Sequence, residues 1–162
     1  MDFTVEVERS LRVLDGAVAL LDGSQGAEPQ TETVWRQADK YGVPRLIFVN
    51  KMDKMGADFY MSIESVAQRL SNKAIPIQLP IGKADTFEGV IDLITMKAYH
   101  FEGEKGIDVV EGEIPADMQA QAEEYREAMI DAISMFDDEL AEKFLGGEEI
   151  SNDLIKRAIR KG

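Results

Sequence analysis

The sequence contains no cysteine and a single histidine, His100. Without cysteine the chain forms neither disulfides nor thiolate metal sites, and one histidine excludes a metal site built from several imidazoles. No run of about 18 apolar residues is present, and the residues after Met1 are charged and amphipathic, so neither a membrane span nor a signal peptide is expected. These absences fit a cytoplasmic protein, and we interpret His100 as structural.

Basic residues are also scarce, and their shortage is concentrated in one segment. The net charge is −13; residues 102–149 hold 16 acidic and 3 basic residues, whereas residues 1–101 hold 14 and 11. Such an acidic segment disfavours direct contact with nucleic-acid phosphates and favours a basic protein partner. The alternative interpretation is a solubilising surface.

The first 73 residues have the pattern of an α/β domain. Residues 17–21 and 46–49 are continuous apolar runs typical of strands, and a helix from Pro29 to about Tyr41 is predicted between them. Short loops favour parallel strands with a right-handed crossover. Because residues 46–49 show no alternation, we expect that strand to be buried on both faces. Two more helices are predicted, one at about 57–70 and one at the start, with apolar residues Phe3, Val7, Leu11 and Leu14.

From residue 74 onward the pattern changes to that of an α+β domain. Strand-like stretches separated by glycine-containing turns predict a small antiparallel sheet, and helices follow. We therefore expect two domains, 1–73 and 74–162. The predicted elements of the second are strands within 74–82, 87–101 and 106–115, a long helix over 115–136, a short helix over 138–147 and a last helix capped by Ser151.

The long helix separates apolar from acidic residues. Helical spacing groups its apolar side chains into one stripe and its carboxylates on an exposed side. The stripe consists of Tyr125, Met129, Ile133 and Phe136, and the exposed carboxylates are Glu123, Glu124, Glu127 and Asp131.

The apolar run 46–49 ends abruptly in Asn50, Lys51, Met52 and Asp53. In open α/β sheets, ligands bind just beyond the carboxyl ends of the strands. A guanine base presents two adjacent donors, N1–H and the N2 amine, and the Asp53 carboxylate can accept both. The Asn50 amide can serve O6 or N7, and the stem of Lys51 can cover the base or the sugar. The alternative is a polar turn with no ligand.

The residues NKMD at 50–53 resemble the guanine-specificity motif of the GTPase superfamily. Residues 2–59 are similar to the G domain of the bacterial elongation factor G family, and AIPIQLPIG, FEGVIDLITMKA and IPADM are similar to its inserted G prime subdomain. The resemblance covers the whole chain. It implies an α/β fold for 1–73, part of a P-loop GTPase with a Rossmann-like parallel sheet, and an α+β G prime subdomain for 74–162. It also implies the family's activity, the GTP-dependent translocation of tRNA and mRNA on the ribosome, with GTP or GDP and Mg²⁺.

The chain departs from this family in what it lacks. It contains no G-x-x-x-x-G-K-[ST] loop for phosphates, and no Asp-Thr-Pro-Gly-His motif precedes Asp2. The family's first switch region and its Ser-Ala loop are missing too. We interpret the chain as a piece of such a factor with no catalytic residues. Alone, we expect no GTP hydrolysis, weak nucleotide binding and no tightly held metal. A ribosomal protection protein or a release-factor GTPase is the alternative parent, although each matches the inserted region less well.

The resemblance implies a protein partner as well. In this family the inserted subdomain faces the C-terminal domain of the ribosomal stalk protein, which offers basic helices. We expect the four exposed carboxylates of the long helix to make that contact; otherwise this face is only solvated and the chain is an inert structural piece. Because the strands that would flank 17–21 are missing, we also expect self-association through exposed sheet edges.

Overall fold

The computed structural model describes residues 4–162, and these form two compact units. The first comprises residues 4–74 together with 83–87, and the second comprises 75–82 and 88–162. The chain therefore leaves the first unit after residue 74, returns to it for five residues and leaves it again. Sequence patterns did not predict this return.

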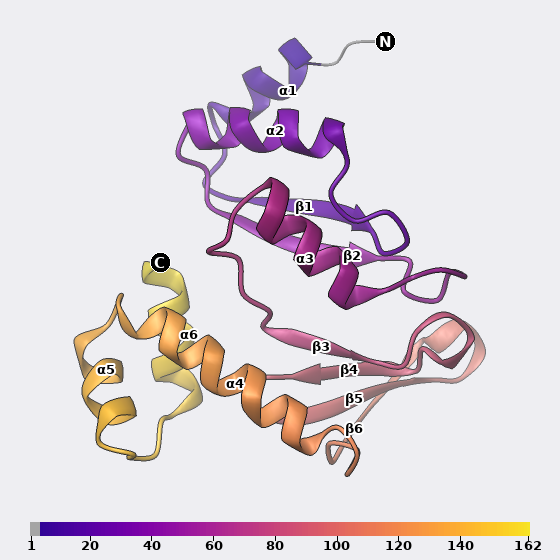
Figure 1. Cartoon of the computed structure of the whole chain (residues 1–162), viewed down its shortest axis with the longest axis vertical. Coiled ribbons are helices and arrows are strands. Elements are labelled where there is room, and N and C mark those ends of the chain that lie inside the picture. The colour runs from indigo at the N-terminus through magenta and orange to yellow at the C-terminus, as the bar shows by residue number, and fades with distance from the viewer. Residues whose placement is uncertain (1–3) are drawn as a thin grey trace. The chain divides into compact units, whose positions relative to one another are not determined.

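The first unit is a parallel strand pair with helices. The strands pair from Ala17–Arg45 through Asp22–Asn50, so their carboxyl ends coincide. Arg45 connects β2 to α2, because its guanidinium donates to the Trp35 carbonyl and stacks over the Trp35 ring at 4.1 Å. The elements, labelled in Figure 1, are α1 (Thr4–Leu11), β1 (Ala17–Asp22), α2 (Pro29–Lys40), β2 (Arg45–Asn50) and α3 (Phe59–Arg69).

A small apolar core holds the start of this unit together. Leu11 of α1 packs with Ala38 of α2 and with Val43, and Val7 lies against this cluster. The predicted first helix therefore exists, although it ends at Leu11 and leaves Leu14 exposed beyond it. Phe3, the first residue of the predicted apolar stripe, lies outside the described residues.

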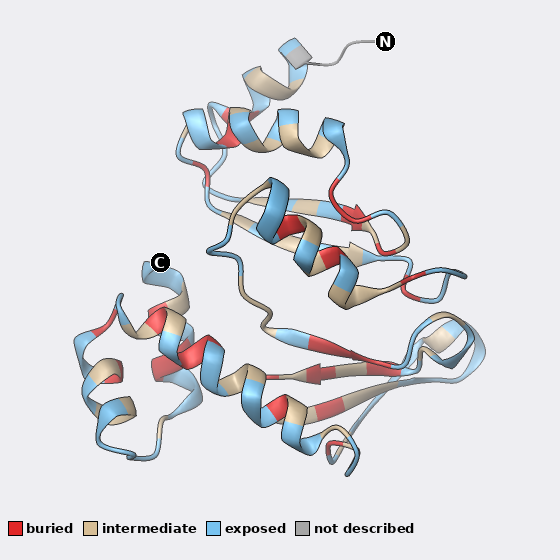
Figure 2. Cartoon of the chain, in the orientation of Figure 1, coloured by how far each residue is buried: buried red, intermediate tan, exposed pale blue. Residues whose placement is uncertain are grey.

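The prediction that 46–49 is buried on both faces is wrong. Burial alternates along β2, and Leu46 and Phe48 are 57% and 55% exposed. Their neighbours on β1, Val18 and Leu20, are exposed on the same face (Figure 2). A continuous apolar run shows that both faces suit an apolar environment, but only neighbouring elements provide one. Within the described part of the first unit, nothing covers this face.

The second unit is built on an antiparallel sheet in the order β3-β4-β5-β6. Leu79, Ile91 and Ala98 are paired across β3, β4 and β5, and all three are fully buried. The predicted small antiparallel sheet is thus confirmed. The strands are β3 (Gln78–Ile81), β4 (Gly89–Asp92), β5 (Lys97–Glu102) and β6 (Asp108–Gly112), with short 3-10 turns at Ala84–Thr86 and Glu104–Gly106.

Three helices complete the second unit: α4 (Gln119–Ser134), α5 (Asp138–Leu145) and α6 (Asn152–Lys161). Met129 and Ile133 of α4 are buried, as predicted, but α4 ends at Ser134 and Phe136 is exposed beyond it. Ser151 caps α6 by accepting a hydrogen bond from the Leu154 N–H, which confirms the predicted cap. None of the helices within residues 4–162 is long and apolar enough to cross a membrane.

Candidate functional site

The candidate site lies where β1 and β2 end together. Asp22 and Asn50, the last residues of the two strands, are register partners. The Gly23 N–H donates to the Asn50 carbonyl at 2.8 Å, which joins the loops that follow the two strands. Parallel strands with a common register bring their carboxyl ends to one edge, and α/β folds bind ligands at such edges.

The three residues predicted to contact guanine are all exposed: Asn50 ends β2, and Lys51 and Asp53 lie in the loop that follows. The Asn50 side-chain oxygen accepts a hydrogen bond from the Lys51 N–H at 2.9 Å, so its amide nitrogen remains available as a donor. Lys51 has a φ of 60°, a left-handed conformation that turns the chain sharply after the strand. The Asp53 carboxylate forms no hydrogen bond or ion pair with the other described residues and can accept two donors.

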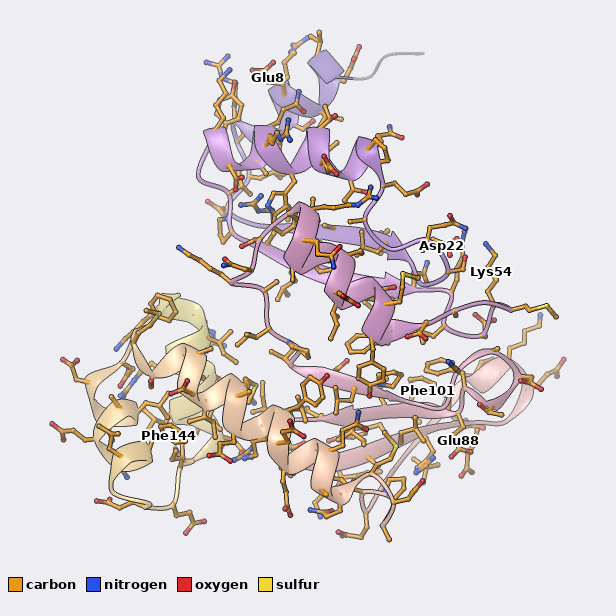
Figure 3. All side chains as sticks on the ribbon, viewed as in Figure 1. Glu8, Asp22, Lys54, Glu88, Phe101 and Phe144 are labelled. Atoms are coloured by element: carbon orange, nitrogen blue, oxygen red, sulfur yellow. The ribbon has the colours of Figure 1, made fainter. Side chains whose placement is uncertain are left out.

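Asp22 pairs with two lysines at this edge of the sheet. Its carboxylate accepts hydrogen bonds from the Ser24 N–H and hydroxyl, and it pairs with the Lys51 ammonium at 3.2 Å and the Lys54 ammonium at 3.3 Å. The hydrogen bonds from Ser24, followed by those from the two lysines, hold the pKa of Asp22 well below its usual range. Figure 3 shows Asp22 and Lys54 reaching toward one another. The ion pair between Asp22 and Lys51 holds the methylene stem of Lys51 at this edge.

Buried packing and backbone hydrogen bonds hold the loop that carries the motif in place. Met52, the variable residue of NKMD, is buried, and its carbonyl accepts a hydrogen bond from the Ala84 N–H at 2.8 Å. Gly23 allows the close approach on the other side, because a Cβ there would lie 3.0 Å from the Met52 sulfur. Asp58 completes the support: its N–H donates to the Gly23 carbonyl, and its carboxylate caps α3 through Met61. The exposed polar residues of the motif are therefore held in place by buried packing and backbone hydrogen bonds beneath them.

The four predicted partner-binding residues lie on α4 of the second unit, away from the guanine motif in the sequence. All four are exposed: Glu123, Glu124, Glu127 and Asp131. Gln119 donates to Glu123 at 2.8 Å, one turn along the helix. Among them, Arg126 turns inward and donates to the carbonyls of Leu93 and Ile94 at 2.6 and 2.7 Å. Partial burial lowers the pKa of Arg126, yet its guanidinium remains charged. The arginine fixes α4 to the turn between β4 and β5 and leaves the acidic face outward.

Sequence reasoning missed Asp22, Ser24 and Lys54 as members of the site. The signal was present, because Asp22 ends an apolar run just as Asn50 does, and strands predicted to be parallel end at one edge. Sequence reasoning also missed the segment 83–87, whose backbone supports the motif; nothing in its composition indicates where it folds.

The described residues form no magnesium site of their own. Within residues 4–162, no three acidic or histidine side chains converge as ligands. His100 lies half-buried on β5, opposite Val110 on β6.

Known proteins similar to this chain agree with the expected family. The chain is 61% identical over its 162 residues to elongation factor G of Ureaplasma urealyticum serovar 10 and, equally, to elongation factor G of Ureaplasma parvum serovar 3. It spans 24% of the length of each of these relatives. A crystal structure of a Thermus thermophilus protein matches with a TM-score of 0.80 and 30% identity, covering 96% of this chain and 23% of that one. The predicted resemblance to elongation factor G and the predicted fold class are confirmed. Because the model of the elongation factor Tu GTP-binding domain matches residues 1–143, the chain belongs to that family.

Proposed function

We propose that this chain is the guanine-recognising part of a translational GTPase of the elongation factor G type, which works in the cytoplasm and moves tRNA and mRNA through the ribosome at the expense of GTP. One observation carries the proposal. NKMD follows a parallel strand, and its Asp53 carboxylate is unpaired in a loop that buried Met52 and its backbone hydrogen bond hold in place. The 61% identity to elongation factor G supports it.

Each motif residue has a role in this proposal. Asp53 accepts the N1–H and N2 amine of guanine as a bidentate pair. Asn50 donates its amide to O6 or N7, while its oxygen stays bonded to the Lys51 N–H. Lys51, held by Asp22, lays its methylene stem along the base or the sugar. Adenine would leave the Asp53 oxygens without donors, which is the type of mismatch that discriminates most strongly.

The chain alone binds guanine nucleotide weakly and does not hydrolyse GTP. Phosphate contacts and a magnesium ion dominate binding and catalysis in GTPases, and the 162 residues contain no G-x-x-x-x-G-K-[ST] motif. A calorimetric titration with GTP and Mg²⁺ should therefore give no tight binding, and phosphate release should equal that of buffer. Tight magnesium-dependent binding would refute this part.

Base recognition is tested by amide NMR shifts with millimolar GDP. Shifts should gather at residues 50–54 with GDP and be absent with ADP. Asp53→Asn should lose the GDP shifts and gain them with xanthosine diphosphate, whose C2 carbonyl accepts from the new amide. Asp85→Asn, an exposed acid outside the motif, is the matched control. Equal shifts with GDP and ADP would show that the loop does not read the base.

A second function is supported by the acidic face of α4. Four exposed carboxylates on one helix, within a segment carrying 16 acidic and 3 basic residues, complement a basic helical partner. We infer docking to the C-terminal domain of the ribosomal stalk protein, with fast and salt-sensitive binding. In an amide NMR titration with that domain, shifts should cluster at residues 123–131 and fade as salt rises. Glu127→Lys should weaken binding more than Glu142→Lys on α5; no shifts from a folded chain would leave this face merely solvated and the chain an inert structural piece.

Self-association is a further candidate, favoured by the uncovered face of the parallel pair. Val18, Leu20, Leu46 and Phe48 form a continuous exposed apolar surface there. Sedimentation velocity at high concentration should show dimers or larger species, and Phe48→Ser should reduce them. A monomeric profile at all concentrations would contradict this inference.

The alternative parent is a ribosomal protection protein or a release-factor GTPase. These relatives share the guanine motif, so the site cannot separate them from elongation factor G. The 61% identity of the whole chain to elongation factor G favours that parent. The coding sequence on both sides of this segment would decide between them.

A further inference from the structure

The outer edge of β6 is open. β6 is the last strand of the second sheet, and within residues 4–162 no other strand pairs with its outer side. Its first four residues are exposed. An edge strand presents unpaired N–H and C=O groups that can template another strand.

The register shows which of these groups face outward. The Phe101 N–H donates to the Glu88 carbonyl, so the backbone of Phe101 faces β4. Val109 is opposite Phe101 on β6, and in an antiparallel ladder its N–H and C=O therefore point away from β5. Glu111 has the same orientation two residues later. Asp108 and Val110, by contrast, exchange hydrogen bonds with β5.

Apolar side chains flank this edge on both faces. Val109 is 60% exposed and lies opposite Phe101; Val110, on the other face, lies opposite His100 and is 43% exposed. Ile107, just before the strand, is 76% exposed. An added strand would thus gain backbone hydrogen bonds and apolar contacts above and below.

Charge selects the kind of strand that fits. Glu102, Asp108, Glu111 and Glu113 are all exposed beside the edge. Lys97 on β5 pairs with Glu113 at 3.1 Å, and among residues 101–114 only Lys105 is basic. A second copy is disfavoured, because it would bring two acidic edges together: a pairing centred on the outward residue Glu111 sets Glu111 of each copy opposite that of the other, and the chain carries a net charge of −13. Like charges directly opposite destabilise a strand pair. A basic segment with alternating apolar residues gains at each of these positions.

We propose that the outer edge of β6 binds an extended, basic segment of a partner protein, which adds to the sheet as a fifth strand. The surface differs from the acidic face of α4 in residues and in mode, since it uses backbone pairing in addition to charge. The binding determinants are the outward amides of Val109 and Glu111, the exposed valines and the surrounding carboxylates.

The test uses the whole 162-residue chain, labelled with ¹⁵N, and a synthetic peptide that alternates lysine and valine. Amide exchange at Val109 and Glu111 should slow by about tenfold or more at saturation, while exchange at Val110, already bonded to β5, should change little. The control peptide keeps the same lysines but replaces alternate valines with proline, which cannot extend the ladder. It should not slow exchange at either residue.

Two variants separate backbone pairing from charge. Val109→Pro removes one outward N–H without breaking a bond to β5 and should abolish the slowed exchange at Glu111. Glu111→Lys keeps every backbone group, although it removes the hydrogen bond from the Tyr99 hydroxyl, and should weaken binding through charge, so a folding failure of the proline variant leaves the proposal testable. Equal binding of both peptides, shifts confined to residues 123–131, or unchanged exchange at Val109 and Glu111 would each overturn the proposal.

Discussion

The two sheets of this chain contain similar apolar residues but differ in how those residues are used. In the second unit, Leu79, Ile91 and Ala98 form a fully buried row across three strands. In the first, Leu46 and Phe48 occupy one face of β2 and remain more than half exposed. The second sheet therefore has a complete apolar core on one face, whereas the parallel pair has an apolar face that is not covered. Composition alone does not reveal this difference.

The largest expected effect is loss of a buried side chain from the complete sheet. Ile91→Ala should destabilise the second unit by about 2–5 kcal/mol, because it removes apolar contacts and leaves a cavity. Leu46→Ala in the first unit is the matched control and should cost less than about 1 kcal/mol, since Leu46 is already exposed. Urea unfolding followed at amides of each unit would measure both. Equal costs would mean that the uncovered face is packed in solution.

An acid-dependent effect is expected in the helices of the second unit. Asp137 pairs with Arg157 at 2.9 Å and with Lys161, and these hydrogen bonds hold the pKa of its carboxyl below its usual range. Because the folded pKa lies below the unfolded value of about 3.8, the stabilisation is present above that pH and is lost as the pH falls below it.

The measurement is the urea midpoint of the second unit between about pH 6 and pH 2, with Asp137→Asn as the variant. The wild-type midpoint should fall on acidification, and the variant should start lower and fall less. Parallel curves for the two proteins would show that other carboxyl groups cause the acid sensitivity.

A smaller effect is expected where α4 is fixed to its sheet. Arg126→Met keeps most of the side-chain length but removes the donors to Leu93 and Ile94. The cost should be about 1.5–3 kcal/mol, the range for hydrogen bonds to a charged group. Arg126→Lys should recover part of it. No loss of stability in Arg126→Met would mean that apolar packing alone positions the acidic helix.

The smallest effect should be the same in both units. Ser151 caps α6 and Asp58 caps α3, each through one hydrogen bond to a backbone N–H. Replacing either with alanine should cost about 1 kcal/mol, because a cap acts within its own helix turn. A much larger loss for Asp58→Ala would indicate that the pairing of its carboxylate with Lys83 matters more than the cap.

Much of the fold could be predicted from the sequence, because its signals are local. Pro29 at a helix start, Ser151 as a cap and the strand ending at Asn50 each leave a mark within a few residues. The NKMD motif could be recognised for the same reason, because its four residues are consecutive in the sequence. Burial of Leu46 and Phe48 could not be predicted, because it depends on elements that must lie against the strand.

The site was predicted only in part for a related reason. Asn50, Lys51 and Asp53 are neighbours in sequence, whereas Asp22 joins them through a strand register that the sequence does not state. The positive φ of Lys51 also escapes prediction, because glycine is the usual residue at such a position and the sequence has lysine.

The return of residues 83–87 to the first unit sets a practical limit on dissecting the protein. A recombinant piece cut at residue 74 would retain every letter of NKMD but lose the Ala84 N–H that bonds to the Met52 carbonyl. The shortest piece with an intact motif loop therefore runs to Phe87 and must carry β3 with it. When this part is swapped between related factors to make a chimera, the junction should accordingly lie after residue 87 and not at residue 74.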